Sequence, residues 1–579
     1  MNIGGYDSAG VAYVYNNEVK IQKEVGKIIE LEKMVNYNDF SNIGIGHTRW
    51  ATHGGVTKYN SHPHKSGKIT LVHNGIVENY EQLKIDLEEQ GYVFVSETDT
   101  EVIAALIDKL YKEFNNLLKV INMCKDILIG SYALAIISDD EKDTIYATRK
   151  DSPLIIAYDE NDYYIASDVP AILKYTNKYS LIENNEIIKI SFDKHEIYDI
   201  NLNKITKEIL IFEGSLEAAE KSGYEHFMLK EINEQPKVIE NTTNKFIENN
   251  IDSLIKNMPN FKKYKKIDIV ACGSAYHTGL IGKNLIEEYA NIPVNVEIAS
   301  EYRYKKLFLD TNSLVILVSQ SGETADTLAS LRIAKSHGSD TLAIVNVVGS
   351  SIAREADNVI YIKAGPEIAV ATTKAYSAQL IILSLIALYT AFENNNIDEL
   401  KLIDYIKEIK NLPNNINSLL NNNQYQEIAK SIYNNNSIFY LGRKIDYAIA
   451  LEGSLKLKEI SYIHSEAYAA GELKHGTISL IEKDTPVIAI ITDLNIADKT
   501  ISNIKEVAAR GARVFIITNE KINSIFNFDY EKVIIPNSSS LIQSNLAIIP
   551  LQLIAYETAK LKGCDIDKPR NLAKSVTVE

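Results

Sequence analysis

The chain has 579 residues, of which 61 are Lys or Arg and 76 are Asp or Glu, so its formal net charge is −15 at pH 7. This acidic balance argues against a nucleic-acid partner or an anionic membrane, because both attract a basic protein surface. With 45% hydrophobic and 24% charged residues, the composition is typical of a globular protein, and the length predicts several domains.

The chain has three cysteines, Cys124, Cys272 and Cys564, which are too few for a disulfide framework or a zinc ligand set. A reducing cytoplasm is therefore the expected location. The longest nearly apolar stretch, 380–392, is shorter than the roughly 18 residues of a membrane span, and we expect a buried helix there. The first residues, MNIGGYDSAG, lack the basic and apolar regions of a signal peptide.

Residues 1–212 contain short apolar runs rich in β-forming residues, and turn residues separate these runs. One helical stretch, at about 99–123, interrupts them. The pattern predicts one domain of packed sheets with flanking helices. The residues that follow begin with EGSLEAAEKSG, which has no apolar periodicity, and we expect a linker over 213–237.

From about residue 265 strands and helices alternate, and the pattern repeats about 170 residues later. Each copy ends in an apolar helix, at 376–393 and 540–560. We predict a duplicated α/β domain with parallel strands, over 257–395 and 428–570, followed by a tail at 571–579. The predicted strands begin near residues 268, 314, 341 and 358 in the first copy and near 437, 486, 513 and 532 in the second.

The Asn-rich stretch 411–424 lies between the copies and is expected to be the joint. In open parallel sheets, ligands bind beyond the carboxyl ends of the strands. In the first copy, one strand is followed by Ser319-Gln320-Ser321-Gly322-Glu323-Thr324 and then a helix. Hydroxyl groups and free N–H groups at a helix start favour a phosphate, whereas an ordinary serine N-cap is the alternative. The second copy lacks this hydroxyl cluster, so we expect phosphate in the first copy only.

A charged segment near residue 460, LEGSLKLKEISYIHSEAYAAGELKHG, is a second candidate. A solvated helix face with i,i+4 ion pairs would explain it. Small and apolar neighbours favour partly buried charges instead, and a carboxylate with an imidazole could then transfer protons on a sugar. The spacing leaves both interpretations open. Lys574, in the tail, is a further candidate, although a lysine near a terminus is usually solvated.

Polar residues of the first region gather at GHTRWATHG (46–54), LVHNGIVEN (71–79) and SETDTE (96–101). Arg49 could bind a carboxylate, and Asp99 an ammonium group. Asn74 and Gly75, expected just after a strand, could supply an oxyanion hole. Metal binding is disfavoured because the local histidines lack an i,i+4 pair or an obvious carboxylate partner; these are His47, His53, His62, His64 and His73.

Together these strings resemble the glutamine–fructose-6-phosphate aminotransferase (isomerizing) family, the glucosamine-6-phosphate synthases. GYDSAG, HTRWATHG, HNGIVEN, SETDTE and KEINEQP resemble its glutaminase half and the junction. ACGSAYHTG, IASEYRY, SQSGETADTL, EAYAAGELKHG and PRNLAKSVTVE resemble its sugar-isomerase half. The resemblance implies an α/β fold: an N-terminal-nucleophile αββα glutaminase domain (1–212) without its first strand, followed by two duplicated three-layer sugar-isomerase domains.

The resemblance also implies an activity. The family hydrolyses glutamine, passes the ammonia through an internal channel to fructose 6-phosphate, and isomerises the imine to glucosamine 6-phosphate. This reaction is the first step of amino-sugar synthesis and needs no external cofactor. We expect a homodimer with sites shared across subunits.

Matching positions supply the expected roles. Lys574 would form a Schiff base with the ketose, Glu459 would move a proton between C1 and C2, His475 would open the sugar ring, and Lys456 would shuttle a proton. The residues expected to line the sugar-phosphate pocket are Ser274, Ser319, Gln320, Ser321, Thr324, Val370 and Thr372. Those expected in the glutamine site are Arg49, Thr52, His53 and Asp99, with Asn74 and Gly75 as the oxyanion hole and Trp50 as the channel gate.

One departure concerns the glutaminase nucleophile, which in the family is a cysteine at the mature N-terminus. Here Met1-Asn2-Ile3-Gly4 directly precede the first matching string, and Gly4 stands where the family has an arginine. About twenty residues, roughly a strand and a helix, are expected before it. Cys124 lies mid-chain, where a structural role is expected. We therefore predict that this polypeptide does not hydrolyse glutamine. A start codon assigned too late and a damaged gene both explain the departure.

Two other functions remain open. An ammonia-dependent synthase or plain phosphosugar isomerase would use Lys574, Glu459 and His475 alone. A non-catalytic sugar-phosphate sensor would require Lys574 and Glu459 to be dispensable.

Overall fold

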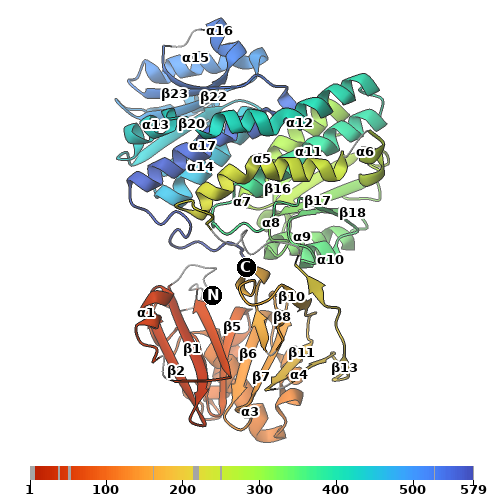
Figure 1. Ribbon diagram of the computed structural model, residues 1–579, viewed down its shortest axis with the longest axis vertical. Coiled ribbons are helices and arrows are strands. Elements are labelled where there is room, and N and C mark those ends of the chain that lie inside the picture. The colour runs from red at the N-terminus through yellow and green to blue at the C-terminus, as the bar shows by residue number, and fades with distance from the viewer. Residues whose placement is uncertain are drawn as a thin grey trace. The chain divides into compact units, whose positions relative to one another are not determined.

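The computed structural model describes residues 7–36, 39–49, 54–160, 162–192, 194–212, 221–247, 251–526 and 529–577 (Figure 1). The chain divides into two compact units, Met1–Ala219 with Arg570–Glu579 and Glu220–Pro569. The first unit contains the predicted glutaminase half and the tail. The second contains both predicted sugar-isomerase copies.

The first unit is built from three antiparallel sheets, with strand orders β2-β1-β3, β14-β10-β8-β9 and β13-β12-β11-β7-β6-β5-β4. One face of the largest sheet packs against α3 and α4. On its other face, Val72 and Ile137 share a core with Ala12 and Ile45 of the three-stranded sheet. Alternation along the strands therefore produces the predicted packed sheets with a helical layer.

The strands of the first unit are β1 Ser8–Tyr15, β2 Glu18–Val25, β3 Gly44–Arg49, β4 His64–Ser66, β5 Ile69–Val77, β6 Gly130–Ser138, β7 Thr144–Lys150, β8 Ile155–Tyr158, β9 Tyr163–Ala166, β10 Lys178–Leu181, β11 Ile187–Ser191, β12 Lys194–Tyr198, β13 Lys204–Ile205 and β14 Leu210–Ile211. Its helices are α1 Ile28–Glu32, α2 Tyr80–Glu88, α3 Asp99–Phe114 and α4 Leu117–Ile127, with a 3₁₀ turn at Val169–Ala171.

The helical stretch predicted at 99–123 is two helices, α3 and α4. Asn115 ends α3 in the left-handed conformation, with φ 48°. The side chain of Asn116 then caps α4 by accepting a hydrogen bond from the N–H of Lys119. Asparagine suits both positions because it tolerates positive φ and is a good N-cap.

The second unit contains two five-stranded parallel sheets with the same topology, β16-β15-β17-β18-β19 and β21-β20-β22-β23-β24. The sequence matched four strands of the first copy with four strands of the second, and the structure confirms all four matches in the same order. The edge strands β16 and β21 were not predicted. Both are short and half-exposed, so they lack the apolar run by which the central strands were recognised.

The first copy consists of β15 Lys266–Ala271, α7 Gly273–Leu285, β16 Val294–Ile298, α8 Ala299–Tyr302, β17 Ser313–Ser319, α9 Ala325–Ser336, β18 Asp340–Val345, α10 Ser351–Glu355, β19 Asn358–Tyr361 and α11 Lys374–Glu393. The second consists of β20 Ser437–Gly442, α14 Ile445–Ser461, β21 His464–Ala469, β22 Pro486–Ile491, α15 Ala497–Ala508, β23 Arg513–Asn519, α16 Glu520–Phe526, β24 Glu531–Ile535 and α17 Ser540–Leu561. The remaining helices are α5 Phe227–Phe246, α6 Ile251–Asn257, α12 Glu399–Leu420 and α13 Gln424–Ile432.

One hydrophobic core joins alternate residues of both sheets to the helices between them, which include α5, α11, α12, α14 and α17 (Figure 1). The other face of each sheet has its own smaller core. Helix α11 is long and apolar enough to cross a membrane, but 94% of its most apolar window is buried in the protein. Its composition therefore follows from its central position, as the sequence predicted.

Two predicted connections differ from the structure. Helix α5 begins at Phe227, inside the linker expected over 213–237, and buries residues such as Met228, Ile232 and Val238. Helix α12 continues to Leu420 through most of the Asn-rich joint. Its buried leucines and isoleucines recur at helical spacing, and this periodicity outweighs the low helix propensity of the asparagines.

Candidate active site

The carboxyl end of β17 carries the predicted phosphate loop. Ser319 Oγ lies 3.0 Å from Thr324 Oγ1 and accepts a hydrogen bond from the N–H of Gly322. Ser321 Oγ accepts one from the N–H of Glu323. Gln320, Ser321 and Thr324 are half-buried, and α9 begins directly after Thr324. The structure thus brings these hydroxyl groups to one helix N-terminus, a suitable site for an anion.

Gly322 allows this loop to close. Its φ is +68°, and a Cβ there would lie 2.0 Å from Ser350 Oγ. The loop is also fixed to the start of α10, because Glu323 Oε1 accepts a 2.7 Å hydrogen bond from the N–H of Ser351. The turn therefore requires glycine, and α10 holds it in place.

The charged segment near residue 460 is divided among α14, β21 and the 3₁₀ turn Glu472–His475. On α14, Lys456 and Glu452 are fully buried, so the interpretation as a solvated helix face is wrong for them. Lys456 Nζ lies 2.7 Å from Glu459 Oε2 and 3.5 Å from Glu452 Oε1. Glu459 stays 21% exposed, so a ligand can reach the carboxylate that the buried ammonium holds.

Burial by itself lowers the pKa of Lys456, but the carboxylates of Glu459, Glu452 and Glu367 outweigh it and raise that pKa above its ordinary value. These carboxylates therefore favour the ammonium form of Lys456. Glu452 and Glu367 had no role in the sequence prediction. The i,i+4 and i,i+3 spacing of Glu452, Lys456 and Glu459 was the signal that placed these three groups on one helix face.

Helix α7 of the first copy faces this cluster. Ser274 Oγ accepts a 3.1 Å hydrogen bond from Lys456 Nζ. One turn further on, His277 Nδ1 lies 2.7 Å from Glu452 Oε2. His277 was also missed by the sequence prediction, because nothing in its local sequence shows that α7 and α14 pack together.

Val370 and Thr372 lie in the loop before α11 and are half-buried. The N–H of Val370 donates to the carbonyl of Asp567. Glu231 on α5 accepts hydrogen bonds from the N–H groups of Ile368 and Ala369. The KEINEQP string therefore holds the loop that carries two predicted pocket residues.

Of the two other predicted catalytic residues, His475 belongs to the same unit as the α14 cluster and Lys574 does not. His475 is exposed on the 3₁₀ turn Glu472–His475, after β21, and makes no hydrogen bond or ion pair with that cluster among the described residues. Lys574 is half-buried in the tail, which groups with the first unit.

The matching strand end of the second copy is closed. Asp446, at the start of α14, is 2% exposed and accepts hydrogen bonds from both the N–H (2.9 Å) and the hydroxyl of Thr492 after β22. Burial raises the pKa of Asp446 to about 6 despite these bonds, so it is a carboxylate at neutral pH. A phosphate would meet this negative charge, which agrees with the prediction of phosphate in the first copy only.

In the first unit, Arg49 ends β3 and is 4% exposed. Its guanidinium donates to the carbonyls of Gly54 (3.1 Å) and Gly55 (3.2 Å). Arg49 therefore fixes the end of the segment that contains Trp50, Thr52 and His53. These three predicted residues lie outside the described residues.

Asp99 begins α3, and its Oδ2 accepts a 2.9 Å hydrogen bond from the N–H of Val77 at the end of β5. Thr98 caps the helix, and Glu101 accepts a hydrogen bond from the N–H of Ser96. Part of the SETDTE string therefore caps the start of α3 and fixes the turn that precedes it. The same arrangement holds Asp99 against the strand that carries Asn74 and Gly75.

Asn74 and Gly75 lie within β5, paired with Ala133 and Tyr132 of β6, and not after the strand as predicted. Gly75 has φ +142°, and a Cβ there would lie 2.1 Å from the carbonyl oxygen of Ser131. Only glycine fits this close approach. Both residues are half-buried.

The histidines of this unit form a buried cluster. The rings of His47 and His62 stack at 4.3 Å, and Thr100 Oγ1 lies 3.1 Å from both His62 Nε2 and His73 Nδ1. Burial lowers the pKa of His47 and of His64 to about 3, so these rings are neutral. In the described part of the chain, no group of three His, Cys, Asp or Glu side chains could hold a metal ion.

Neither Cys124 nor Cys272 has the surroundings of an activated nucleophile. Cys124 is buried on α4, and burial raises the pKa of its thiol to about 12. Burial also raises the pKa of Cys272. Cys564, in the second unit, lies 3.8 Å from the carbonyl oxygen of Ser461. A nucleophilic cysteine needs a lowered pKa, so the structural role expected for Cys124 agrees with its surroundings.

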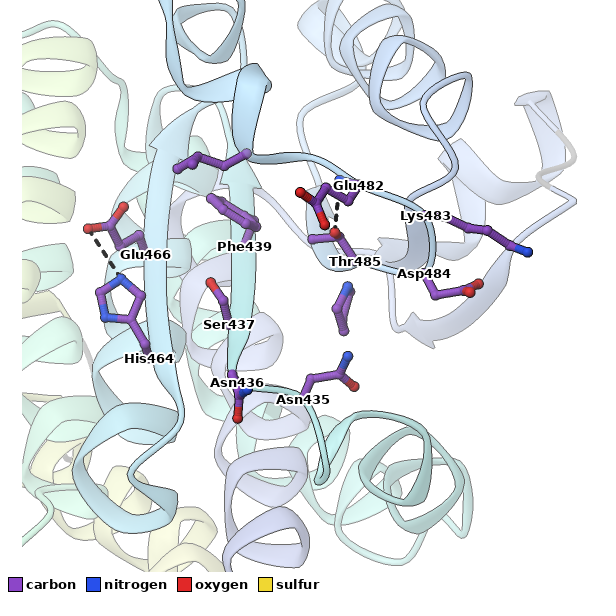
Figure 2. Close-up of a pocket in the computed structure, with 12 residues that line it drawn as sticks. Asn435, Asn436, Ser437, Phe439, His464, Glu466, Glu482, Lys483, Asp484 and Thr485 are labelled. Atoms are coloured by element: carbon purple, nitrogen blue, oxygen red, sulfur yellow. Dashed lines mark hydrogen bonds and ion pairs between the residues drawn. The ribbon is translucent and has the colours of Figure 1, made fainter.

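A cavity of about 470 Å³ lies at the amino ends of β20 and β22, and its lining includes Asn435, His464, Lys483 and Asp484 (Figure 2). His464 and Glu466 of edge strand β21 face each other there, with 3.6 Å between Nε2 and Oε1. Ligands of parallel α/β sheets bind at the opposite, carboxyl ends. This cavity is therefore not the candidate site.

Comparison with known families agrees with this architecture. A sugar-isomerase (SIS) domain model matches residues 260–389 and 431–561, and a glutamine amidotransferase domain model matches residues 56–174. A glutamine–fructose-6-phosphate aminotransferase (isomerizing) of Clostridium tetani is 48% identical over 99% of this chain and 96% of its own length. The chain belongs to this family. A relative with the same name from Fusobacterium nucleatum is 46% identical over 99% of this chain and 95% of its own.

Solved structures resemble the second unit. The C-terminal domain of glucosamine-fructose-6-phosphate aminotransferase from Francisella tularensis is 40% identical, covers 60% of this chain and all of its own, and has a TM-score of 0.58. A putative phosphosugar isomerase from Clostridium difficile, 22% identical with a TM-score of 0.50, shares the fold. The predicted family and fold class are thereby confirmed.

Proposed function

We propose that this protein forms glucosamine 6-phosphate from fructose 6-phosphate, with glutamine as the nitrogen donor of its family. The buried Lys456–Glu459 pair supports this most strongly. Family members carry the amidotransferase and sugar-isomerase domains that this reaction combines, and this chain matches both. The reaction is the first step of amino-sugar synthesis and takes place in the cytoplasm.

The sugar phosphate occupies the β17–α9 loop, where Ser319, Gln320, Ser321 and Thr324 bind it, with Ser274, Val370 and Thr372 lining the pocket. The amine of Lys574 attacks the C2 carbonyl of the ketose to form a Schiff base, and the carbonyl oxygen leaves as water. Ammonia then takes the place of the lysine. His475 assists opening of the sugar ring.

Isomerisation then moves one proton. Glu459 takes a proton from C1 and a proton is returned to C2, which converts the 2-imine into the 2-amino aldose. The Lys456 ammonium stabilises the Glu459 carboxylate and supplies a proton to the departing oxygen or nitrogen. The exposed edge of Glu459 and the complete burial of Lys456 suit these two roles.

The first unit, 1–212, is the glutamine half. Arg49, Thr52, His53 and Asp99 bind glutamine, Asn74 and Gly75 form the oxyanion hole, and Trp50 is the gate to the channel. Burial raises the pKa of the thiols of Cys124 and Cys272, which supports ammonium as the nitrogen donor of a polypeptide of this sequence. The sugar-isomerase domains are 257–395 and 428–570, and the tail 571–579 carries Lys574. The protein works as a homodimer.

A paired assay with fructose 6-phosphate tests the proposal, with ammonium in one arm and glutamine in the other. We expect glucosamine 6-phosphate with ammonium and none with glutamine. Product in neither arm would contradict the proposed reaction, and binding of fructose 6-phosphate without turnover would favour the sensor. Glucose 6-phosphate formed without ammonium would identify a plain isomerase. Product with glutamine would show that the glutamine half is active.

A further inference from the structure

His277, a histidine that the proposed chemistry does not use, binds the innermost carboxylate of the α14 cluster. Its Nδ1 lies 2.7 Å from Glu452 Oε2. A carboxylate only accepts hydrogen bonds, so this nitrogen carries a proton and donates it. Glu452 is fully buried, whereas the His277 side chain is 12% exposed. The bond joins the two sugar-isomerase copies, since His277 lies on α7 and Glu452 on α14.

This hydrogen bond is one of two between facing helices. Ser274 and His277 are three residues apart on α7, and Glu452 and Lys456 are four apart on α14, so each pair shares a helix face. Ser274 meets Lys456, with 3.1 Å between Oγ and Nζ, and His277 meets Glu452. A continuous series of contacts therefore runs from His277 through Glu452 and Lys456 to Glu459.

The Lys456 ammonium is shared by two carboxylates at unequal distances, 2.7 Å from Glu459 and 3.5 Å from Glu452. A buried carboxylate needs compensating partners, because it has lost its hydration. The imidazole of His277 binds Oε2 of Glu452, whereas Lys456 lies nearer to Oε1. Without it, Glu452 would compete more strongly for the ammonium and draw it away from Glu459.

We propose that His277 is a positioning residue for the isomerisation step: it holds Glu452, so that Lys456 stays paired with Glu459, the carboxylate that moves the proton. The inference rests on the proposed function of this site. Because His277 acts through Glu452 and Lys456, its loss lowers kcat and leaves the KM for fructose 6-phosphate nearly unchanged.

The test measures glucosamine 6-phosphate formation by the full chain with ammonium as nitrogen donor. His277→Leu removes the donor, and we expect kcat to fall by roughly 10- to 100-fold, the effect of a lost hydrogen bond to a charged group. His277→Asn keeps an N–H donor close to the position of Nδ1 and should restore kcat to within about threefold of the original protein. KM should stay within about twofold in both variants.

His226→Leu is the matched control. It breaks another imidazole hydrogen bond of the second unit, 2.9 Å from Nδ1 to the hydroxyl of Tyr556, and should leave kcat unchanged. If His277→Leu fails to fold, as judged by circular dichroism, His277→Asp replaces it. Its carboxylate repels Glu452, so kcat should fall well below that of His277→Asn.

The outcomes separate the two proposals. No product from the original protein would overturn the proposed function. An active original protein with an unchanged His277→Leu variant would overturn this inference alone. The inference would also be overturned if His277→Asn had the same kcat as the Leu or Asp variant. It would be overturned as well if the substitutions changed KM and left kcat unchanged.

Discussion

In the first copy β17 is followed by a loop of hydroxyl groups that could bind an anion. In the second copy β22 is followed by Thr492, whose N–H and hydroxyl already donate to the carboxylate of Asp446. Both copies share one strand order. The difference therefore comes from a few residues at the strand ends and not from the fold.

The helices that follow the first strand of each copy have also diverged. In the first copy α7 presents Ser274 and His277, and in the second α14 presents Glu452, Lys456 and Glu459. The two helices pack face to face, so neither copy holds the site alone. The loop proposed to bind the phosphate therefore lies in one copy, and the groups proposed to transfer protons lie in the other.

The largest effect on kcat is expected from substitution of Glu459, the partly exposed carboxylate on α14 of the second copy. Glu459→Gln keeps the size of the side chain but removes its basicity, so kcat should fall by roughly 10²- to 10⁴-fold. Steady-state kinetics with ammonium and fructose 6-phosphate measure this. Full activity of the variant would show that α14 does not carry the proton transfer.

The next largest effect is expected on the KM for fructose 6-phosphate, from substitutions in the Ser319–Thr324 loop of the first copy. Ser321→Ala combined with Thr324→Val removes two hydroxyl donors from the loop, and the KM for fructose 6-phosphate should rise by about 10- to 100-fold. Asp493→Ala, at the matching strand end of the second copy, is the control and should leave KM unchanged. A comparable rise in both would mean that the change in KM does not come from the loss of hydroxyl donors in the first copy.

The burial of Asp446 at the closed strand end predicts a pH-dependent free energy of unfolding. The folded pKa of Asp446, about 6, lies above the ordinary value of 3.8 for an aspartate, so the folded state binds this proton more tightly than the unfolded state does. The stability contributed by the proton is complete below about pH 4 and is lost as pH rises to about 6. Asp446→Asn should remove this loss, which amounts to about 1–3 kcal/mol at pH 7.

Thermal unfolding of both proteins between pH 4.5 and 8 measures this difference, with Glu531→Gln on the exposed surface as a control. The original protein should approach the stability of the asparagine variant at the acidic end. Parallel pH curves for the two would contradict a raised pKa at Asp446.

The smallest effect is expected from Gly322→Ala. Positive φ and the approach of Ser350 should destabilise the loop by about 1–2 kcal/mol. Fructose 6-phosphate binding should weaken, as isothermal titration would show. Gly338→Ala also has positive φ, +77°, but no atom lies within 4 Å of its Cβ position, so it separates backbone strain from the clash at Gly322.

The sequence predicted most of the central strands because they are continuous apolar runs, and it predicted α11 for the same reason. It missed β16 and β21, and it did not foresee that the Asn-rich joint is mostly α12. Edge strands and surface helices bury only part of their residues, so their patterns are weaker. The loop Ser319–Thr324 was found because its hydroxyl groups directly follow a strand.

The sequence by itself determined the duplication, the family and the group of charges near residue 460, because these depend on order and spacing along the chain. Only the tertiary structure decided which of those charges are buried. Lys456 and Glu452 lose all solvent exposure because α7 of the other copy packs over them, and His277 meets Glu452 across 175 residues of sequence. Such a contact depends on how two helices pack, and a local sequence pattern does not predict it.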